Sequence, residues 1–259
     1  MLNWLRKLWP GIGPKAIPEA LWQHTLQHYP FLAELSYPEQ LRLRSMTGQF
    51  LAQKEFSGAQ GLQVTDAMAV AIAAQACLPV LHLSLRLYDD FKGIVLHPGA
   101  MLARRKVIDD AGVVHHYSEV LAGEAMEGGP VTLSWQDVAA SGELAAKGYN
   151  VVIHEFVHKI DMHDGAPNGC PPLPSRAAKA AWQAVMQAAY EEFKNQLVMA
   201  ERFGGRPPWL DAYAAESPAE FFAVASEAYF VNRQRFEEDF SALATIFDAF
   251  FKRKMTVAL

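Results

Sequence analysis

The segment His154-Glu155-Phe156-Val157-His158 has the residue types and the spacing that could hold and use a metal ion. Histidines four residues apart lie one turn apart on the same face of a helix, so both imidazoles can reach one ion. Glu155 directly follows the first histidine, and from there its carboxylate can hydrogen-bond a metal-bound water instead of binding the metal. The segment therefore predicts a metal site in which Glu155 moves protons.

The residues around this segment favour a metal over an ordinary buried pair of histidines. The other positions of the predicted helix are apolar: Val152, Ile153, Phe156, Val157 and Ile160. Such a helix should be buried, and burying two imidazoles and a carboxylate is costly unless all three are satisfied together. A hydrogen-bonded pair of core histidines is the alternative. Because the pattern is the HExxH arrangement of zinc peptidases, we expect one Zn²⁺ per chain, bound by His154 and His158, with Glu155 as catalytic base.

A catalytic zinc site usually has three protein ligands and an open position for water, so one ligand must come from elsewhere. Asp164 stands six residues after His158, where some HExxH families place their third ligand. However, Asp161 occupies the place of the glycine that those families need for the turn. Glu220 on a later helix is the better candidate, and it would complete a His₂Glu site.

Glu220 lies on the apolar face of a helix that opens at Ser217-Pro218, and Glu227 lies two turns further along the same face. A carboxylate on such a face needs a partner, which a metal would supply. Ser217 followed by Glu220 also fits a capping box, so this glutamate has a purely structural alternative. Glu227 is the second choice as a ligand, or an acid that supports a ligand.

Two further residues could assist at such a site. Tyr213 lies just ahead of the later helix, and its phenol could approach the metal and donate a hydrogen bond to an oxyanion. Asp161 lies on the face of His154 and His158 and could accept the ring N–H of a ligating histidine. An ordinary core tyrosine and a helix-end acid without a role are the alternatives.

The elements that must position these residues form an α+β pattern that is mostly helical. Prolines and capping residues delimit early helices at about 18–29, 38–55 and 66–77. Three β-rich runs bounded by glycine and proline follow, at 93–97, 113–120 and 131–135. Later helices are predicted at about 151–164, 175–202, from 217 onward and 234–253. A small sheet therefore precedes the helix that carries the HExxH segment.

Composition limits the class of protein. A chain that is 51% hydrophobic and 20% charged should fold, and its length fits one large domain or two small ones. With 23 basic and 28 acidic side chains, the charge argues against direct binding to nucleic acid or to an anionic membrane. Two cysteines, Cys77 and Cys170, argue against a disulfide framework, and no apolar stretch approaches the ~20 residues that span a bilayer. We therefore expect a soluble, cytoplasmic protein.

Three segments together resemble the Mlc titration factor A family: His154–Met162, Ala212–Ala223 and Gly129–Trp135. The resemblance covers nearly the whole chain. It implies a zincin-like fold and a gluzincin-like zinc metallopeptidase, distantly similar to the catalytic domain of anthrax lethal factor. It also implies the two histidines and Glu220 as zinc ligands, the glutamate of the HExxH segment as catalytic base, and Tyr213 as the group that stabilises the transition state.

The same resemblance implies an activity and a partner. The activity is that of an aminopeptidase acting on peptides, and the partner is the glucose-responsive transcriptional repressor Mlc, whose repression of sugar-transport genes would be relieved. Because the expected ligands span 154–220, we expect a single metallopeptidase domain over 1–259. Its helical N-terminal part would be 1–80, and the sheet with the zinc-binding core would be 81–259.

A different class of function remains open: a non-catalytic regulatory protein that sequesters a repressor and has a secondary zinc site. The last predicted helix carries one apolar stripe, formed by Phe236, Phe240, Leu243, Phe247 and Phe250. That stripe could belong to the core or lie in a groove of a partner. The run 131–135 is similarly open, because it could be an exposed edge strand that pairs with a peptide substrate or an ordinary sheet strand.

Overall fold

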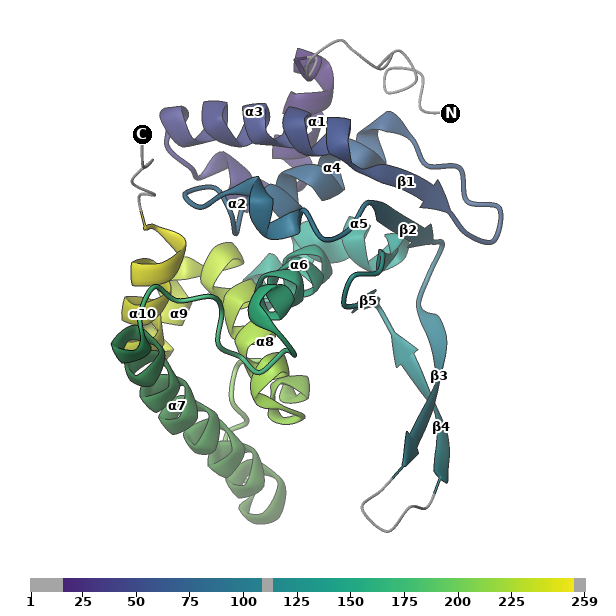
Figure 1. The fold of residues 1–259 in the computed structure, drawn as a ribbon. Coiled ribbons are helices and arrows are strands. Elements are labelled where there is room, and N and C mark those ends of the chain that lie inside the picture. Colours follow the sequence, from purple (N-terminus) through teal and green to yellow (C-terminus); the bar gives the residue numbers. More distant parts are fainter. Residues whose placement is uncertain (1–15, 109–113, 254–259) are drawn as a thin grey trace.

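The computed structural model of the chain describes residues 16–108 and 114–253 (Figure 1). The N-terminal helices are α1 (Glu19–His28), α2 (Pro30–Ala33), α3 (Tyr37–Gln53) and α4 (Asp66–Cys77). Local capping sets two of the helix starts. The backbone N–H of Ser36 donates to Glu39 at 3.1 Å before α3, and the hydroxyl of Thr65 accepts the N–H of Met68 at 3.2 Å before α4. The first 15 residues of the predicted N-terminal part lie outside the described residues.

The small sheet has the strand order β1-β2-β6-β5. Its strands are β1 (Glu55–Gly58), β2 (Gly93–His97), β6 (Val131–Ser134) and β5 (Gly123–Ala125). β1, β2 and β6 run parallel to one another, and β5 runs antiparallel to β6. The prediction of a mostly helical α+β fold with a small sheet ahead of the HExxH helix is therefore confirmed.

The run 131–135 is not the edge of this sheet, so the interpretation as an exposed edge strand is wrong. β6 pairs with β2 on one side and with β5 on the other, and Trp135 already begins helix α5 (Trp135–Leu144). Val131 and Leu133 of β6 are also fully buried. The two edges of the sheet are β1 and β5, and in β5 Gly123 pairs with Leu133 and Ala125 with Val131 of β6.

A separate antiparallel hairpin lies between β2 and β5 in the chain. It consists of β3 (Met101–Ile108) and β4 (Val114–Leu121), and Figure 1 shows it extending away from the helices. The predicted β-rich run 113–120 corresponds to β4, except that Val113 lies outside the described residues. The hairpin returns the chain to the sheet directly before β5.

The C-terminal half is helical. Its helices are α6 (Val151–Asp161), α7 (Arg176–Phe203), α8 (Pro218–Val231), α9 (Arg233–Asp239) and α10 (Ser241–Phe251). Asn150 caps α6, since its side-chain oxygen accepts the N–H of Ile153 at 2.9 Å. The Asn150 amide also donates to Gln75 of α4 at 2.8 Å, which joins the two halves of the chain in the interior.

The apolar stripe predicted on the last helix belongs to the core. The helix is interrupted at Phe240, and the buried residues of the stripe are Phe236, Leu243, Phe247 and Phe250. Phe247 stacks on Trp182 of α7, with ring centroids 5.4 Å apart. The stripe therefore packs against the long helix α7 and does not form an open groove-binding face.

One cluster of buried apolar side chains extends from Ile17 to Phe251 and includes residues of α4, α6 and α8. α4 is buried almost all round, as expected for a helix composed mainly of Ala, Val and Ile. Within the described residues, no helix is both long and apolar enough to cross a membrane.

Candidate metal centre

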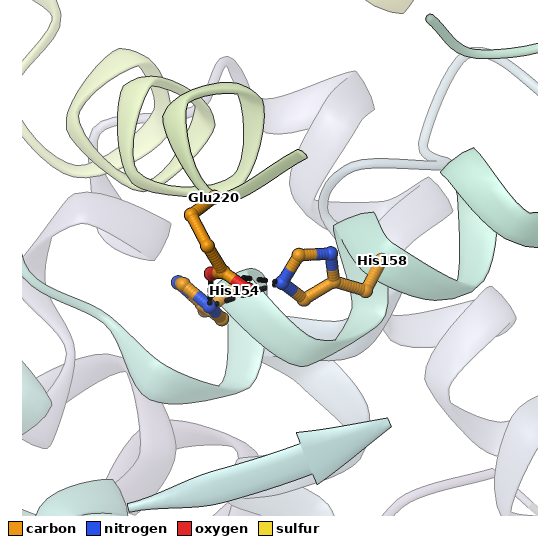
Figure 2. Close-up of side chains that lie close together, drawn as sticks. All are labelled: His154, His158 and Glu220. Atoms are coloured by element: carbon orange, nitrogen blue, oxygen red, sulfur yellow. Dashed lines mark hydrogen bonds and ion pairs between the residues drawn. The ribbon is translucent and has the colours of Figure 1, made fainter. Parts of the chain in front are cut away.

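Helices α6 and α8 bring His154, His158 and Glu220 together (Figure 2). The Nε2 atoms of the two histidines lie 3.2 Å apart. Oε2 of Glu220 lies 3.0 Å from Nε2 of His154 and 3.2 Å from Nε2 of His158. Three potential ligand atoms from two helices thus face one point.

These spacings fit a small metal ion. Zinc bonds of 2.0–2.1 Å in tetrahedral geometry place neighbouring ligand atoms about 3.3 Å apart. The measured separations of 3.0, 3.2 and 3.2 Å are close to that value. Two neutral imidazoles would otherwise direct like atoms at each other, which a cation between them relieves. The donor set is therefore compatible with a metal such as zinc.

The start of α8 explains how Glu220 reaches this point. The hydroxyl of Ser217 caps α8 by accepting the N–H of Glu220 at 3.1 Å. The side chain of Glu220, by contrast, extends to the two histidines of α6. Ser217 and Glu220 thus belong to the same turn. The Glu220 side chain contacts the two histidines, so its role is not limited to capping the helix.

Glu227 lies on the other side of the His154 ring. Its Oε1 lies 2.7 Å from Nδ1 of His154, and its Oε2 accepts the backbone N–H of Asn150. A carboxylate at Nδ1 favours the tautomer with the proton on that nitrogen, which leaves Nε2 with a free electron pair toward Glu220. Of the two roles considered for Glu227, this position matches the acid that supports a ligand.

The electrostatic setting is acidic and buried. Burial disfavours the charged form of His154, but Glu227, Glu220 and Glu155 outweigh it and raise the pKa of His154 well above its usual value. Burial raises the pKa of Glu155, although both histidines act in the opposite direction. Burial also works to raise the pKa of Glu220, but the hydrogen bonds to the two histidines lower it overall. A divalent cation would offset this concentration of carboxylates.

A cavity of about 200 Å³ opens beside the two helices. Glu155 and Tyr213 both line it, together with Gly123 of β5, Tyr149 and Asp211. Glu155 is only 5% exposed, whereas Tyr213 is 39% exposed. The ring of Tyr213 lies 6.1 Å from that of His154, measured between centroids. The cavity is thus lined by a buried carboxylate, a phenol and one of the candidate ligands, His154.

Asp161 and Asp164 have contacts other than those considered from the sequence. Both oxygens of Asp161 accept backbone N–H groups of the following loop, from Asn168, Gly169 and Cys170 at 2.7–3.0 Å. The carboxylate therefore holds the loop that leads to α7 and is not used to orient a histidine ring. Asp164 pairs with Lys179 at 2.6 Å, away from the metal centre.

Lys159 is a buried residue of α6 that the sequence analysis did not single out, and it connects this helix to two other segments. The Nζ of Lys159, whose side chain is fully buried, donates to Asp90 at 2.8 Å and to the carbonyl of Met126 at 2.7 Å. It also donates to the carbonyl of Gly129 at 3.3 Å. The available signal was its position directly after His158 on an apolar helix, where a lysine needs partners if it is buried.

Comparison with known proteins identifies the relatives of this site. The family profile of glucose-regulated metallo-peptidase M90 matches residues 2–252. The chain belongs to this metallopeptidase family. The proteins called Mlc titration factor A of Yersinia pestis (strain Pestoides F) and Yersinia pseudotuberculosis (serotype O:1b, strain IP 31758) are each 37% identical to it over 254 residues. Those alignments cover 98% of this chain and 90% of each relative. The M90 membership confirms the resemblance drawn from the sequence, and the mostly helical α+β fold is that of a metallopeptidase.

Proposed function

We propose that this M90 protein is a zinc-dependent metallopeptidase that acts on peptides as an aminopeptidase. The observation that carries the proposal is the convergence of His154, His158 and Glu220 at separations that suit a tetrahedral ion. These three residues would hold one zinc per chain, and their nitrogen and carboxylate donors are those of hydrolytic zinc sites. Zinc held there supplies a Lewis acid and lowers the pKa of its water to ~7.

Three residues of the chain would have separate roles in the reaction. Glu155, buried at the wall of the cavity, accepts the proton of the attacking water and returns it to the leaving amine. Burial raises the pKa of its carboxyl group, which makes the carboxylate a stronger base toward the water. Tyr213 donates a hydrogen bond to the oxyanion of the tetrahedral intermediate. Glu227 keeps the proton of His154 on Nδ1.

The proposed partner is a transcriptional repressor of the Mlc type. The name of the relatives, Mlc titration factor A, supports this assignment, and a 37% identity over nearly the whole chain supports its transfer. Binding would relieve repression through protein contact, with no direct binding to nucleic acid. Among the described residues Cys77 and Cys170 are free thiols, which supports a location in the reducing cytoplasm. We further propose that residues 1–259 form one domain, supported by the continuous core.

Metal analysis and peptidase assays on the same purified sample test the catalytic proposal. We expect chelation to abolish turnover of small aminoacyl substrates and added Zn²⁺ to restore it. Glu220→Ala should lose the metal, since only two ligands remain. Glu155→Gln should keep the metal and lower kcat by about 10²–10⁴-fold, and Tyr213→Phe by up to about 10²-fold. Glu191→Gln on the exposed side of α7 is the control, with wild-type kcat and metal content.

The alternative is a regulatory protein without catalysis, which the relatives' name also favours. A pull-down of purified Mlc with Glu155→Gln separates the two roles. Binding by this variant at wild-type affinity would show that sequestration does not need turnover. Normal turnover by Glu155→Gln would exclude the proposed base, and full metal content in Glu220→Ala would exclude the proposed ligand.

A further inference from the structure

Gly123 at the start of edge strand β5 lies directly against the side chain of Glu155. A Cβ atom built on Gly123 would lie 2.6 Å from Cγ and 2.7 Å from Cδ of Glu155, and closer still to its Oε1. Real Cβ atoms essentially never approach other heavy atoms to within 3.0 Å. Any residue other than glycine would therefore collide with the carboxylate unless the side chain of Glu155 or one of the two segments moved.

Space, and not backbone conformation, is what requires glycine here. Among the described residues, positive φ angles occur at Gly128 and other turn glycines but not at Gly123, so its backbone suits any residue. Glu155 is only 5% exposed, but its side chain lines the cavity, so an added Cβ atom would displace the carboxylate toward that space. The contact between the strand and the carboxylate is thus a tight one.

Strand β5 is held by its pairing with β6, and the turn that follows it is held by helix α6. Gly123 pairs with Leu133 of β6, and the carbonyl of the preceding Ala122 accepts the N–H of Ser134 at 2.7 Å. On the helix side, Lys159 donates to carbonyls of the turn that follows β5. Lys159 lies four residues after Glu155 and so on the same face of α6. This face of α6 contacts β5 through Glu155 and contacts the turn between β5 and β6 through Lys159.

We propose that Gly123 is a positioning residue for the catalytic glutamate. Its missing side chain lets β5 lie against Glu155 and fixes the carboxylate at the wall of the cavity, where it must meet the water and the leaving amine. This inference rests on the proposed function of Glu155 as the base. A proton acceptor must be held within hydrogen-bond reach of its target, and a displacement of about 1 Å can cost about 10²-fold in rate.

The substitution Gly123→Ala tests the proposal in the zinc-loaded, full-length protein. We expect kcat to fall about 10²-fold while zinc content stays at the wild-type level and KM changes less than about threefold. A residue that merely stabilised the sheet would not produce this split between kcat and KM. Gly93→Ala is the matched control, because Gly93 lies in β2 of the same sheet and, of the described residues, its added Cβ would meet only Pro130, at 3.3 Å. Wild-type kcat for Gly123→Ala would overturn the proposal.

A thermal unfolding cycle with Glu155→Ala provides a second readout that does not depend on turnover. In the wild-type background we expect Gly123→Ala to lower Tm by about 5 °C, as overpacking does. In the Glu155→Ala background, where the colliding atoms are absent, it should change Tm by less than about 1 °C. Equal losses in both backgrounds would overturn the contact. Wild-type protein without peptidase activity would contradict the proposed function. If Gly123→Ala still lowered Tm only when Glu155 was present, the contact between Gly123 and Glu155 would nevertheless be supported.

Discussion

The ring of His154 is held from both ends, by Glu220 at Nε2 and by Glu227 at Nδ1. Partners that hold the outer nitrogen of a ligating histidine fix its tautomer and increase its basicity. We therefore expect Glu227→Gln to weaken zinc binding by about 10–100-fold, because the neutral amide supports the ring less well. Competition against a chromogenic chelator measures this change.

The control for that measurement is Glu238→Gln, whose glutamate accepts a hydrogen bond from Gln234 on the exposed side of α9. It should bind zinc as the wild type does. Wild-type affinity in Glu227→Gln would show that the carboxylate does not support the ligand, and complete loss of zinc would point to a direct role as ligand.

At this scale the sequence located some residues well and others poorly. Spacing alone placed His154 and His158 on one helical face, because helical periodicity is local. Asp161 lies near that same face, yet its carboxylate binds the backbone of 168–170. Which distant segment reaches a given side chain is decided by tertiary packing, and periodicity does not contain that information.

At the scale of elements, the sheet was harder to predict than the helices. Caps and prolines mark the helix ends, so α1, α3 and α4 could be placed from the sequence. β5 has three residues, Gly-Glu-Ala, without the β-branched or aromatic residues that mark a strand. For the more strand-like segment 131–134 the sequence left an edge strand and an ordinary sheet strand open, because the pattern of side chains does not say which strands pair on either side.

Lys159 connects two of these elements, α6 and the turn between β5 and β6. Lys159→Met removes the charged donor to the carbonyls of Met126 and Gly129 and to the carboxylate of Asp90, and hydrogen bonds made by a charged group contribute more than neutral ones. We expect the free energy of unfolding to fall by about 2–3 kcal/mol, measured by urea denaturation.

Lys179→Met is the matched control, since Lys179 also pairs with an aspartate but its side chain is 43% exposed. Exposed ion pairs contribute little, so this change should cost less than about 1 kcal/mol. Similar decreases in the free energy of unfolding for the two variants would show that Lys159 does not stabilise the contact between α6 and the turn that joins β5 to β6.

At the scale of the whole molecule, the continuous core predicts one cooperative unfolding transition. Leu32 of α2 and Phe247 of α10 lie far apart in the sequence but are both fully buried in that core. In metal-free protein we expect Leu32→Ala to cost about 2–5 kcal/mol and Phe247→Ala about 3–5 kcal/mol. Both should shift the same transition, as followed by calorimetry. Two separable transitions, each sensitive to one variant, would contradict a single domain.

The hydrogen bonds at the two ends of α6 also fix the rotation of this helix about its own axis. Asn150 joins the start of the helix to Gln75 of α4, and Lys159 joins its end to the turn between β5 and β6. Successive side chains project about 100° apart around a helix. A rotation of that size would exchange the direction of His154 for that of Glu155, toward β5 instead of α8. By fixing the angle at both ends, the fold keeps His154 directed at α8 and Glu155 directed at β5.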